Sequence, residues 1–437
     1  MGFVLDNQII AQVMPGILTV SILVQICFAK TVLANFVFGD SLVEAGNYNY
    51  IPTLSRANII PNGIDFGMPT GRFTNGRTIF DIVGKYWYSF YFLSATSHKL
   101  LVVAIPCKLF VACFLVFFFF LSFFKIFSPG QELGFKDFTP PYLAPTTTRS
   151  VVLQGVNYAS GRGRILNQTG KIFTSFLSPW MFILLFPLSS SMIIEEAKAI
   201  NFQVKLIDCT IQMQDIIGSI GALAALNLFG TALFSVTIGS NDFINNYLTP
   251  VISIAEQKLV SPQVFVGTMI SRYRLQLTRL YDLGARKLVV ANVGPIGCIP
   301  YQRDLNPTTG DNCVDFPNHL AQSFNAQLKS LITNLSTNLQ GSKFVYADVY
   351  HIVADILQNF ISYGGNNANF SCCYFIGRFG GMVPCGPSSQ VCMDRSKYVF
   401  SDPYHPTDAA NVIIVTRLMD GDSNDITPMN IRQLAEL

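Results

Sequence analysis

The second half of the chain alternates short apolar segments with amphipathic helical segments, and this alternation restricts the fold more than any other feature. From about residue 208, strand-like runs at 232–238, 287–293 and 344–349 alternate with helical patterns at 261–283 and 316–339. Neighbouring parallel strands need a crossover connection, which is usually a helix. The alternation therefore predicts an α/β fold with a mostly parallel sheet and helices on both faces.

A further strand is expected near the N-terminus, because Ala34 to Phe38 is short, apolar and rich in aromatic residues. Gly39-Asp40-Ser41 follows as a sharp turn, and Glu44 stands three residues after Ser41. Ser41 could cap a helix that begins there, or it could be a nucleophile at the carboxyl edge of the sheet. Residues 46–80 are rich in Gly, Asn and Pro and indicate a long surface loop, after which a helix begins near Thr78.

A serine nucleophile needs a base to accept its proton and a carboxylate to orient that base. The chain has four histidines, and His405 lies in a polar loop three residues after Asp402. This spacing brings the carboxylate and the imidazole to one side of a turn. The other histidines have no such neighbour in a loop: His98 in an apolar segment, His319 in a helix and His351 after a strand. Two polar residues in a loop can simply be solvated, but together with Ser41 at a strand end they form a more specific pattern that favours serine catalysis.

An oxyanion intermediate also needs preorganised hydrogen-bond donors. Three candidates stand at predicted strand ends: the N–H of Ser41, the N–H of Gly161 and the side-chain amide of Asn241. Taken singly, Gly161 could equally be a turn glycine, and Asn241 could be a turn or cap residue. Their occurrence in this order along one α/β chain favours an oxyanion hole.

Four ordered blocks of sequence now resemble the plant GDSL esterase/lipases of the SGNH hydrolase superfamily. The blocks are Phe38-Gly39-Asp40-Ser41-Leu42, Asn157-Tyr158-Ala159-Ser160-Gly161, Gly239-Ser240-Asn241-Asp242 and Asp402-Pro403-Tyr404-His405-Pro406. The resemblance extends over most of residues 34–84, 131–171 and 215–435. It implies a three-layer α/β sandwich with a mostly parallel central sheet, secretion, and hydrolysis of acyl esters. It also implies Ser41 as nucleophile, His405 as base, Asp402 as its orienting group, and Gly161 with Asn241 in the oxyanion hole.

The glycine block departs from the family pattern, which is usually a run of small residues. Here Arg162 and Arg164 alternate with Gly161 and Gly163. These two cations could crowd the acyl group or point to solvent. We expect the aliphatic part of each arginine side chain to extend away from the site, so that the guanidinium groups lie in solvent.

Two apolar segments, at about 85–130 and 172–207, interrupt the family pattern. Residues 100–124 contain one charge, Lys108, and residues 173–194 contain none, so each is a candidate for membrane contact. The alternative is that they are untranslated sequence, such as a retained intron, kept in the gene model. If both segments crossed a bilayer, residues 131–170 would lie opposite Ser41, so an active enzyme requires that they do not both span. The expected organisation is one hydrolase domain over residues 30–437 that carries these two inserts.

Several features point to an oxidising compartment. Residues 1–29 contain an apolar stretch, 16–29, of signal-peptide length, for which an uncleaved anchor is the competing interpretation. Six cysteines lie in the C-terminal half and could form up to three disulfides of unknown connectivity. They are Cys298, Cys313, Cys372, Cys373, Cys385 and Cys392. Glycosylation sequons at Asn167, Asn334 and Asn369 also fit secretion.

The composition narrows the range of partners. The net charge is +3 without a long basic run, so we expect no nucleic-acid partner. No group of His, Cys, Asp and Glu has metal-ligand spacing, so we expect no metal and no organic cofactor. The expected substrate is a small-molecule or lipid ester. Two alternatives remain: a catalytically impaired, membrane-associated relative, and an esterase that removes acetyl groups from cell-wall carbohydrate with the same residues.

Overall fold

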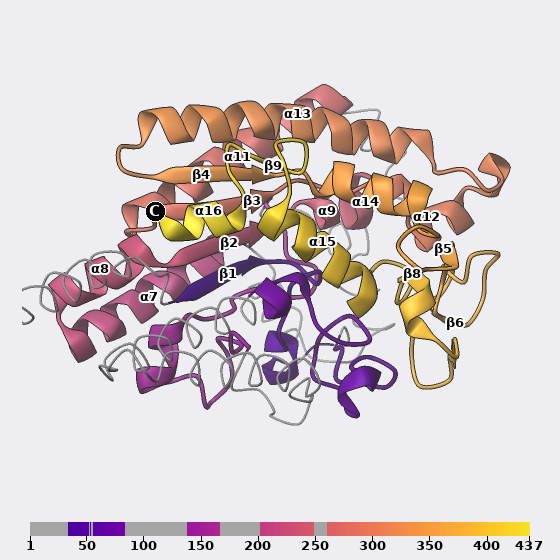
Figure 1. Cartoon of the computed structure of the whole chain (residues 1–437), viewed down its shortest axis with the longest axis horizontal. Coiled ribbons are helices and arrows are strands. Elements are labelled where there is room, and N and C mark those ends of the chain that lie inside the picture. The colour runs from indigo at the N-terminus through magenta and orange to yellow at the C-terminus, as the bar shows by residue number, and fades with distance from the viewer. Residues whose placement is uncertain (1–33, 52, 54–55, 84–137, 167–201, 249–259) are drawn as a thin grey trace, which may run out of the picture.

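The computed structural model describes residues 34–51, 53, 56–83, 138–166, 202–248 and 260–437 (Figure 1). The expected signal segment 1–29, the insert 85–130, most of the insert 172–207, His98 and Asn167 lie outside the described residues. Among the helices that are described, none combines the length and the apolar composition needed to cross a membrane.

The central sheet has five strands in the order β1-β2-β3-β4-β9. The first four pair in parallel, and the short β9 pairs antiparallel with β4 at one edge. Their bounds are β1 Asn35–Gly39, β2 Leu233–Thr237, β3 Lys287–Ala291, β4 Lys343–Ala347 and β9 Ile426–Thr427. The prediction of a mostly parallel sheet is therefore confirmed, and the strands expected at 34–38, 232–238, 287–293 and 344–349 all form.

Helices lie against both faces of this sheet (Figure 1). Successive side chains of a strand point to opposite faces. The ring of Phe38 in β1 meets the ring of Phe202 in α7 (Phe202–Ile220) edge to face, with the ring centroids 5.8 Å apart. Lys287 of β3, whose position in the register belongs to the opposite face, donates through Nζ to the carbonyl of Ala435 in α16 (Ile431–Glu436) over 3.0 Å. Helix α11 (Pro262–Asp282) adjoins α7 and α13 (Asp315–Asn338), and α15 (Asp408–Asp420) adjoins α14 (Val349–Asn359) and α16.

The helices and remaining strands have the following bounds. The longer helices are α7 Phe202–Ile220, α8 Ala222–Thr231, α11 Pro262–Asp282, α13 Asp315–Asn338, α14 Val349–Asn359, α15 Asp408–Asp420 and α16 Ile431–Glu436. The short helices are α9 Ser240–Asp242, α12 Pro300–Leu305, the π-helical turn η4 Phe243–Tyr247, and the 3₁₀ turns η1 Asn47–Tyr50, η2 Ile64–Phe66, η3 Arg149–Gln154, η5 Ile296–Cys298, η6 Pro307–Thr309 and η7 Arg395–Lys397. Two small sheets pair β5 Asn367–Ser371 with β8 Tyr398–Phe400, and β6 Cys373–Tyr374 with β7 Gln390–Val391.

Residues 138–166 are hydrogen-bonded to the first strand of the central sheet. The Val37 N–H donates to the carbonyl of Val156 over 2.9 Å, and the Tyr158 N–H donates back to the carbonyl of Val37 over 2.7 Å. This segment therefore lies beside β1, as the sequence argument required of an active enzyme. The end of the expected insert 172–207 is also part of the fold. Residues 202–207 begin α7, and Phe202 and Leu206 are buried in the core.

The segment 46–80 is not the surface loop that its composition predicted. Its backbone is irregular, with two 3₁₀ turns, but many of its side chains are buried, and Arg72 is 2% exposed. The Arg72 guanidinium donates to both carboxylate oxygens of Asp81 over 2.7 and 2.8 Å. It also lies near the rings of Phe66 and Phe138. A buried bidentate ion pair thus anchors an irregular segment that has no ladder of backbone hydrogen bonds to hold it.

Replacing Arg72 with Met should lower the free energy of unfolding by about 3–5 kcal/mol, because Asp81 would remain buried without its counterion. Urea denaturation followed by circular dichroism measures this change. The matched control is Arg432→Met, which removes a bidentate pair with Asp420 on the surface and should cost about 0–1 kcal/mol. Equal losses in the two variants would contradict the role given to Arg72.

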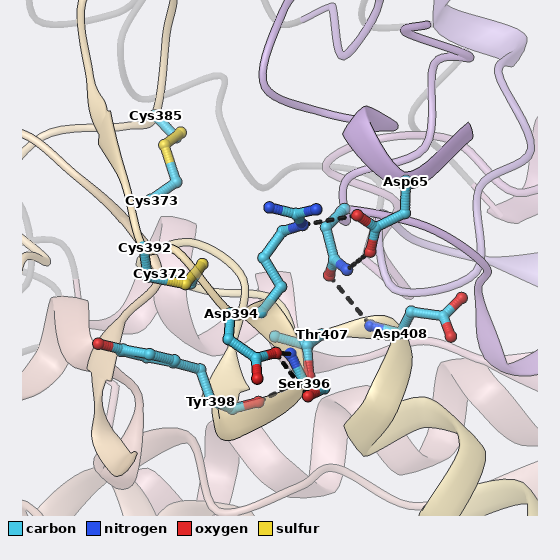
Figure 2. Close-up of a disulfide and its surroundings, with 12 residues drawn as sticks. Asp65, Cys372, Cys373, Cys385, Cys392, Asp394, Ser396, Tyr398, Thr407 and Asp408 are labelled. Atoms are coloured by element: carbon cyan, nitrogen blue, oxygen red, sulfur yellow. Dashed lines mark hydrogen bonds and ion pairs between the residues drawn. A yellow bond between two sulfur atoms is a disulfide. The ribbon is translucent and has the colours of Figure 1, made fainter. Parts of the chain in front are cut away.

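All six C-terminal cysteines are paired, so the expectation of up to three disulfides is confirmed. The pairs are Cys298–Cys313, Cys372–Cys392 and Cys373–Cys385. Figure 2 shows the last two beside a polar network between distant parts of the chain. In this network Asp65 accepts from Arg395 over 2.6 Å and from Asn75 over 2.5 Å, while Asn75 in turn accepts from the N–H of Asp408. The disulfide-rich region is thereby joined to the irregular N-terminal segment and to the start of α15.

Candidate active site

Ser41 lies in the turn that follows β1, at the carboxyl edge of the parallel sheet. The Asp40 N–H donates to the carbonyl of Thr237 over 3.1 Å, and the Asp40 carboxylate accepts from the Leu42 N–H over 3.0 Å. Residues 40–43 form bends and turns, and the next regular element is η1. The interpretation of Ser41 as a helix cap is therefore wrong. The turn is stabilised by Asp40 instead, which leaves the Ser41 hydroxyl at the surface of a cavity.

His405 and Asp402 occupy the loop between β8 and α15, and they meet Ser41 there. His405 Nε2 lies 2.8 Å from Ser41 Oγ, and His405 Nδ1 lies 2.7 Å from Asp402 Oδ2. The other Asp402 oxygen accepts the N–H groups of Tyr404 and His405 over 2.7 and 2.8 Å. One carboxylate thus fixes both the loop and the imidazole. The structure brings together all three residues of the expected triad.

The remaining described histidines do not line the cavity. His319 is exposed on α13, and His351 on α14 is half exposed, with Nε2 3.9 Å from Asp425.

Asn241 reaches the same cavity from α9, directly after β2. Its Oδ1 accepts from Asn245 over 2.5 Å, and its Nδ2 donates weakly to the carbonyl of Gly163 over 3.3 Å. The Gly163 carbonyl can only accept, so it defines which end of the Asn241 amide is the donor, and the bond from Asn245 holds the amide in this orientation. Because one Nδ2 hydrogen is weakly engaged, this group can still donate to a substrate oxygen.

Gly161 does not match its expected role as an oxyanion donor. Its N–H donates to Oε2 of the buried Glu44, and Gly161 is not among the residues that line the cavity. An N–H bonded to a buried carboxyl group can stabilise a substrate oxyanion only by breaking that bond. A Cβ at this position would lie 2.8 Å from Tyr48 and 3.0 Å from Phe73. The glycine is therefore required for close packing.

The two arginines of the glycine block differ from each other. Arg162 is exposed and lines the cavity, with a left-handed backbone conformation of φ 57° that is uncommon outside glycine. Arg164 is 6% exposed, so the expectation that both stems extend outward holds for Arg162 only. Arg164 lies close enough to Asp242 for their charges to interact.

Three buried ionisable residues, Asp40, Glu44 and Lys205, lie in or next to the turn that carries Ser41. The sequence alone did not reveal this group. Lys205 of α7 is 2% exposed and donates to the carbonyl of Gly39, the residue before Asp40. Glu44 accepts the N–H groups of Tyr48 and Gly161 through its two oxygens. Burial lowers the pKa of Lys205 to about 8, and it raises the pKa of Asp40 to about 6 and of Glu44 to about 8. No sequence signal pointed to Lys205, because it falls in a segment that was expected to be an insert.

These pKa shifts predict how stability depends on pH. Because burial raises the pKa of Glu44, the folded chain retains a proton between about pH 4.5 and 8 that the unfolded chain has released. Raising the pH through this window should therefore lower the free energy of unfolding, by roughly 1 kcal/mol per pH unit for this group. Glu44→Gln should flatten that dependence in urea titrations at pH 5, 6 and 7. The exposed Glu436→Gln variant should follow the parent chain, and parallel curves for all three proteins would contradict the assignment.

The cavity at Ser41 has a volume of about 500 Å³. Ser41, Asn241, Asp402 and His405 line it, together with many aliphatic side chains. Such an arrangement can perform acyl transfer through serine: a nucleophile, a base in contact with it, an orienting carboxylate and a side-chain amide donor share one cavity.

Comparison with known proteins gives a consistent result. A model of the family described as GDSL-like Lipase/Acylhydrolase matches residues 124–418, which include His405 and Asp402 but not Ser41. The chain is 51% identical over 422 residues to GDSL esterase/lipase At4g16230 of Arabidopsis thaliana, with 96% of each chain covered. It is 42% identical over 409 residues to GDSL esterase/lipase At2g23540 of the same plant, covering 92% of this chain and 88% of the relative. GDSL esterase/lipase 7 of that plant is 35% identical over 407 residues, with 92% of each chain covered.

Proposed function

The chain belongs to the GDSL-like lipase/acylhydrolase family and is a serine hydrolase of esters, and we propose that Ser41, His405 and Asp402 perform its reaction. One observation carries the proposal: an uninterrupted line of contacts from Ser41 Oγ through the imidazole to Asp402 Oδ2, with separations of 2.8 and 2.7 Å. In this line each group has the position that its role requires.

The reaction follows from this geometry. His405 Nε2 accepts the proton of the Ser41 hydroxyl as Oγ attacks the carbonyl carbon of the ester. The tetrahedral intermediate collapses to an acyl-serine, and His405 returns the proton to the leaving alcohol. Water then attacks the acyl carbon while His405 accepts one of its protons. The bond from this carbon to Ser41 Oγ breaks as His405 returns the proton to Oγ, and the acid is released. Asp402 holds Nδ1–H throughout, so that Nε2 is the nitrogen that accepts the proton, and it stabilises the imidazolium.

We assign the oxyanion hole to the N–H of Ser41 and the side-chain amide of Asn241. The assignment is supported by the shared cavity and by the bond from Asn245 that orients the amide. Gly161 is left out of it, because its N–H is bonded to Glu44.

Asn241→Ala should lower kcat by about 10²–10³-fold, since one oxyanion donor would be lost. The measurement is steady-state hydrolysis of a p-nitrophenyl ester. Asn245→Ala is an informative partner variant, because it removes only the residue that orients the amide, so its effect should be smaller. A kcat within a factor of three of the parent for Asn241→Ala would remove this residue from the oxyanion hole.

The experiment that tests the function itself uses a serine-directed phosphonate. The purified, disulfide-intact chain should hydrolyse p-nitrophenyl butyrate, and the phosphonate should abolish this activity with one adduct per chain. Mass spectrometry of the digest should place the adduct on the peptide that contains Ser41. Hydrolysis that persists after complete labelling, or an adduct confined to another serine, would overturn the proposal.

We also propose a single three-layer sandwich domain of the SGNH hydrolase type over residues 30–437, with inserts at 85–130 and 172–201, and a secreted product. Support for one domain comes from the backbone bonds between Val37 and residues 156 and 158. Support for secretion comes from the three disulfides, which suit an oxidising compartment. Expression with residues 1–29 intact in a plant secretory system, followed by N-terminal sequencing of the medium fraction, tests export and cleavage.

A further inference from the structure

The cavity beside Ser41 extends well beyond the triad. Its volume of about 500 Å³ lies within the range of roughly 300–1,000 Å³ that is typical of sites for drug-sized ligands. An acetyl group contributes only two carbon atoms to such a space and would leave most of it unfilled. The size of the cavity therefore indicates a larger substituent on the ester.

The chemistry of its lining indicates what kind of substituent. Helix α14, strand β8 and helix α15 form one part of the wall, and every lining residue that they supply is apolar. We call this part the aliphatic wall, and define it by Val349, Val353, Ile356, Val399 and Ile414.

Charged lining groups are found elsewhere in the cavity. Asp40, Asp402 and His405 belong to the loops of the triad, and Arg56 and Arg162 are exposed residues. A sugar placed against the aliphatic wall would lose its hydrogen bonds to water and gain no partner there. A hydrocarbon chain would lose only unfavourable contact with water. The wall therefore discriminates against a polysaccharide and in favour of an alkyl chain.

We propose that the aliphatic wall binds an unbranched hydrocarbon chain of the ester, so that the enzyme prefers long-chain esters over esters whose two halves are both short. The inference rests on the proposed function, because the ester bond must lie at Ser41 for the chain to reach the wall. The hydrocarbon could belong to the acid or to the alcohol, and the two arms of the experiment below distinguish them. Each methylene transferred from water to the wall should raise kcat/KM about fourfold until the wall is covered.

The test measures kcat/KM for two series of esters with the full, oxidised chain. The first series varies the acid: p-nitrophenyl acetate, butyrate and octanoate. The second varies the alcohol: ethyl, butyl and octyl acetate. A rise of tenfold or more over two methylenes in the first series assigns the wall to the acyl chain, and the same rise in the second assigns it to the alcohol. Flat dependence in both series would overturn the inference while leaving ester hydrolysis intact. Absence of hydrolysis in both would overturn the proposed function as well.

Variants of Val353 connect the chain-length preference to the wall. Val353→Phe fills space in the cavity and should lower the octanoate-to-acetate ratio of kcat/KM, or the corresponding octyl-to-ethyl ratio, by at least tenfold. Gln358→Phe adds the same ring to the exposed side of α14 and should leave the ratio unchanged. Val353→Thr nearly preserves the shape and places a hydroxyl in the wall, so it should lower the ratio several-fold even if the Phe variant does not fold. Unchanged ratios in Val353→Thr, and in Val353→Phe where it folds, would contradict the proposal.

Discussion

Replacing Ser41 with Ala should lower kcat for p-nitrophenyl butyrate by about 10⁵–10⁶-fold, because the change removes the hydroxyl that lies 2.8 Å from the imidazole of His405. The loss should appear in kcat rather than in KM, since the oxyanion donors and the cavity wall remain. Ser41 is only partly buried and the change removes a single oxygen atom, so the free energy of unfolding should change little.

The matched control for this variant is Ser271→Ala, which removes a hydroxyl from the exposed face of α11. Both variants should give the same urea midpoint as the parent chain, and only Ser41→Ala should be inactive. The phosphonate should label Ser271→Ala and leave Ser41→Ala unlabelled. An active Ser41→Ala protein would exclude Ser41 as the nucleophile.

Replacing Asp402 with Asn should lower kcat by about 10⁴-fold. Asn still offers an oxygen to the N–H groups of Tyr404 and His405, so the loop should keep its conformation. Its NH₂ group, however, would face Nδ1 of the imidazole, which must then lose its proton. The proton would move to Nε2, and Nε2 could no longer accept from Ser41.

Asp394 provides a control of similar local geometry. Its carboxylate accepts the N–H of Ser396 two residues later, in an exposed turn of the neighbouring loop (Figure 2). Asp394→Asn should therefore retain the activity of the parent, while both Asn variants should have near-native circular dichroism. If Asp402→Asn lost only a few-fold in kcat, the orienting role of Asp402 would have to be abandoned.

The features predicted correctly from sequence are those with a local signal. The parallel strands were predicted from short apolar runs that alternate with segments of helical periodicity. A parallel strand is buried on both faces, so its sequence is almost entirely apolar. The strand-end turn and the Asp-x-x-His loop also pointed to Ser41, His405 and Asp402. The structure brings their reactive atoms within hydrogen-bonding distance, while their catalytic roles stay a prediction.

The features that sequence did not predict depend on contacts between distant residues. The composition of segment 46–80, rich in Gly, Asn and Pro, predicted a surface loop. Such a composition indicates an irregular backbone but does not indicate whether the side chains are buried. The interior position of this segment depends on Arg72 pairing with Asp81. Gly161 was expected to bind an oxyanion because motif position alone cannot show that Glu44 already accepts its N–H. The disulfide pairing likewise depended on which cysteines the fold brings together.

The distance along the chain between Ser41 and His405 has a consequence for biosynthesis. The two residues are 364 positions apart, and the bond between them joins the first strand of the sheet to the loop before α15. A ribosome has therefore made nearly all of the polypeptide before the base can meet its nucleophile. Premature termination or loss of the C-terminal segment by proteolysis would leave Ser41 without its base, even where β1, β2 and β3 persisted. With the proposed triad, esterase activity would therefore require that the chain was synthesised and folded through residue 405.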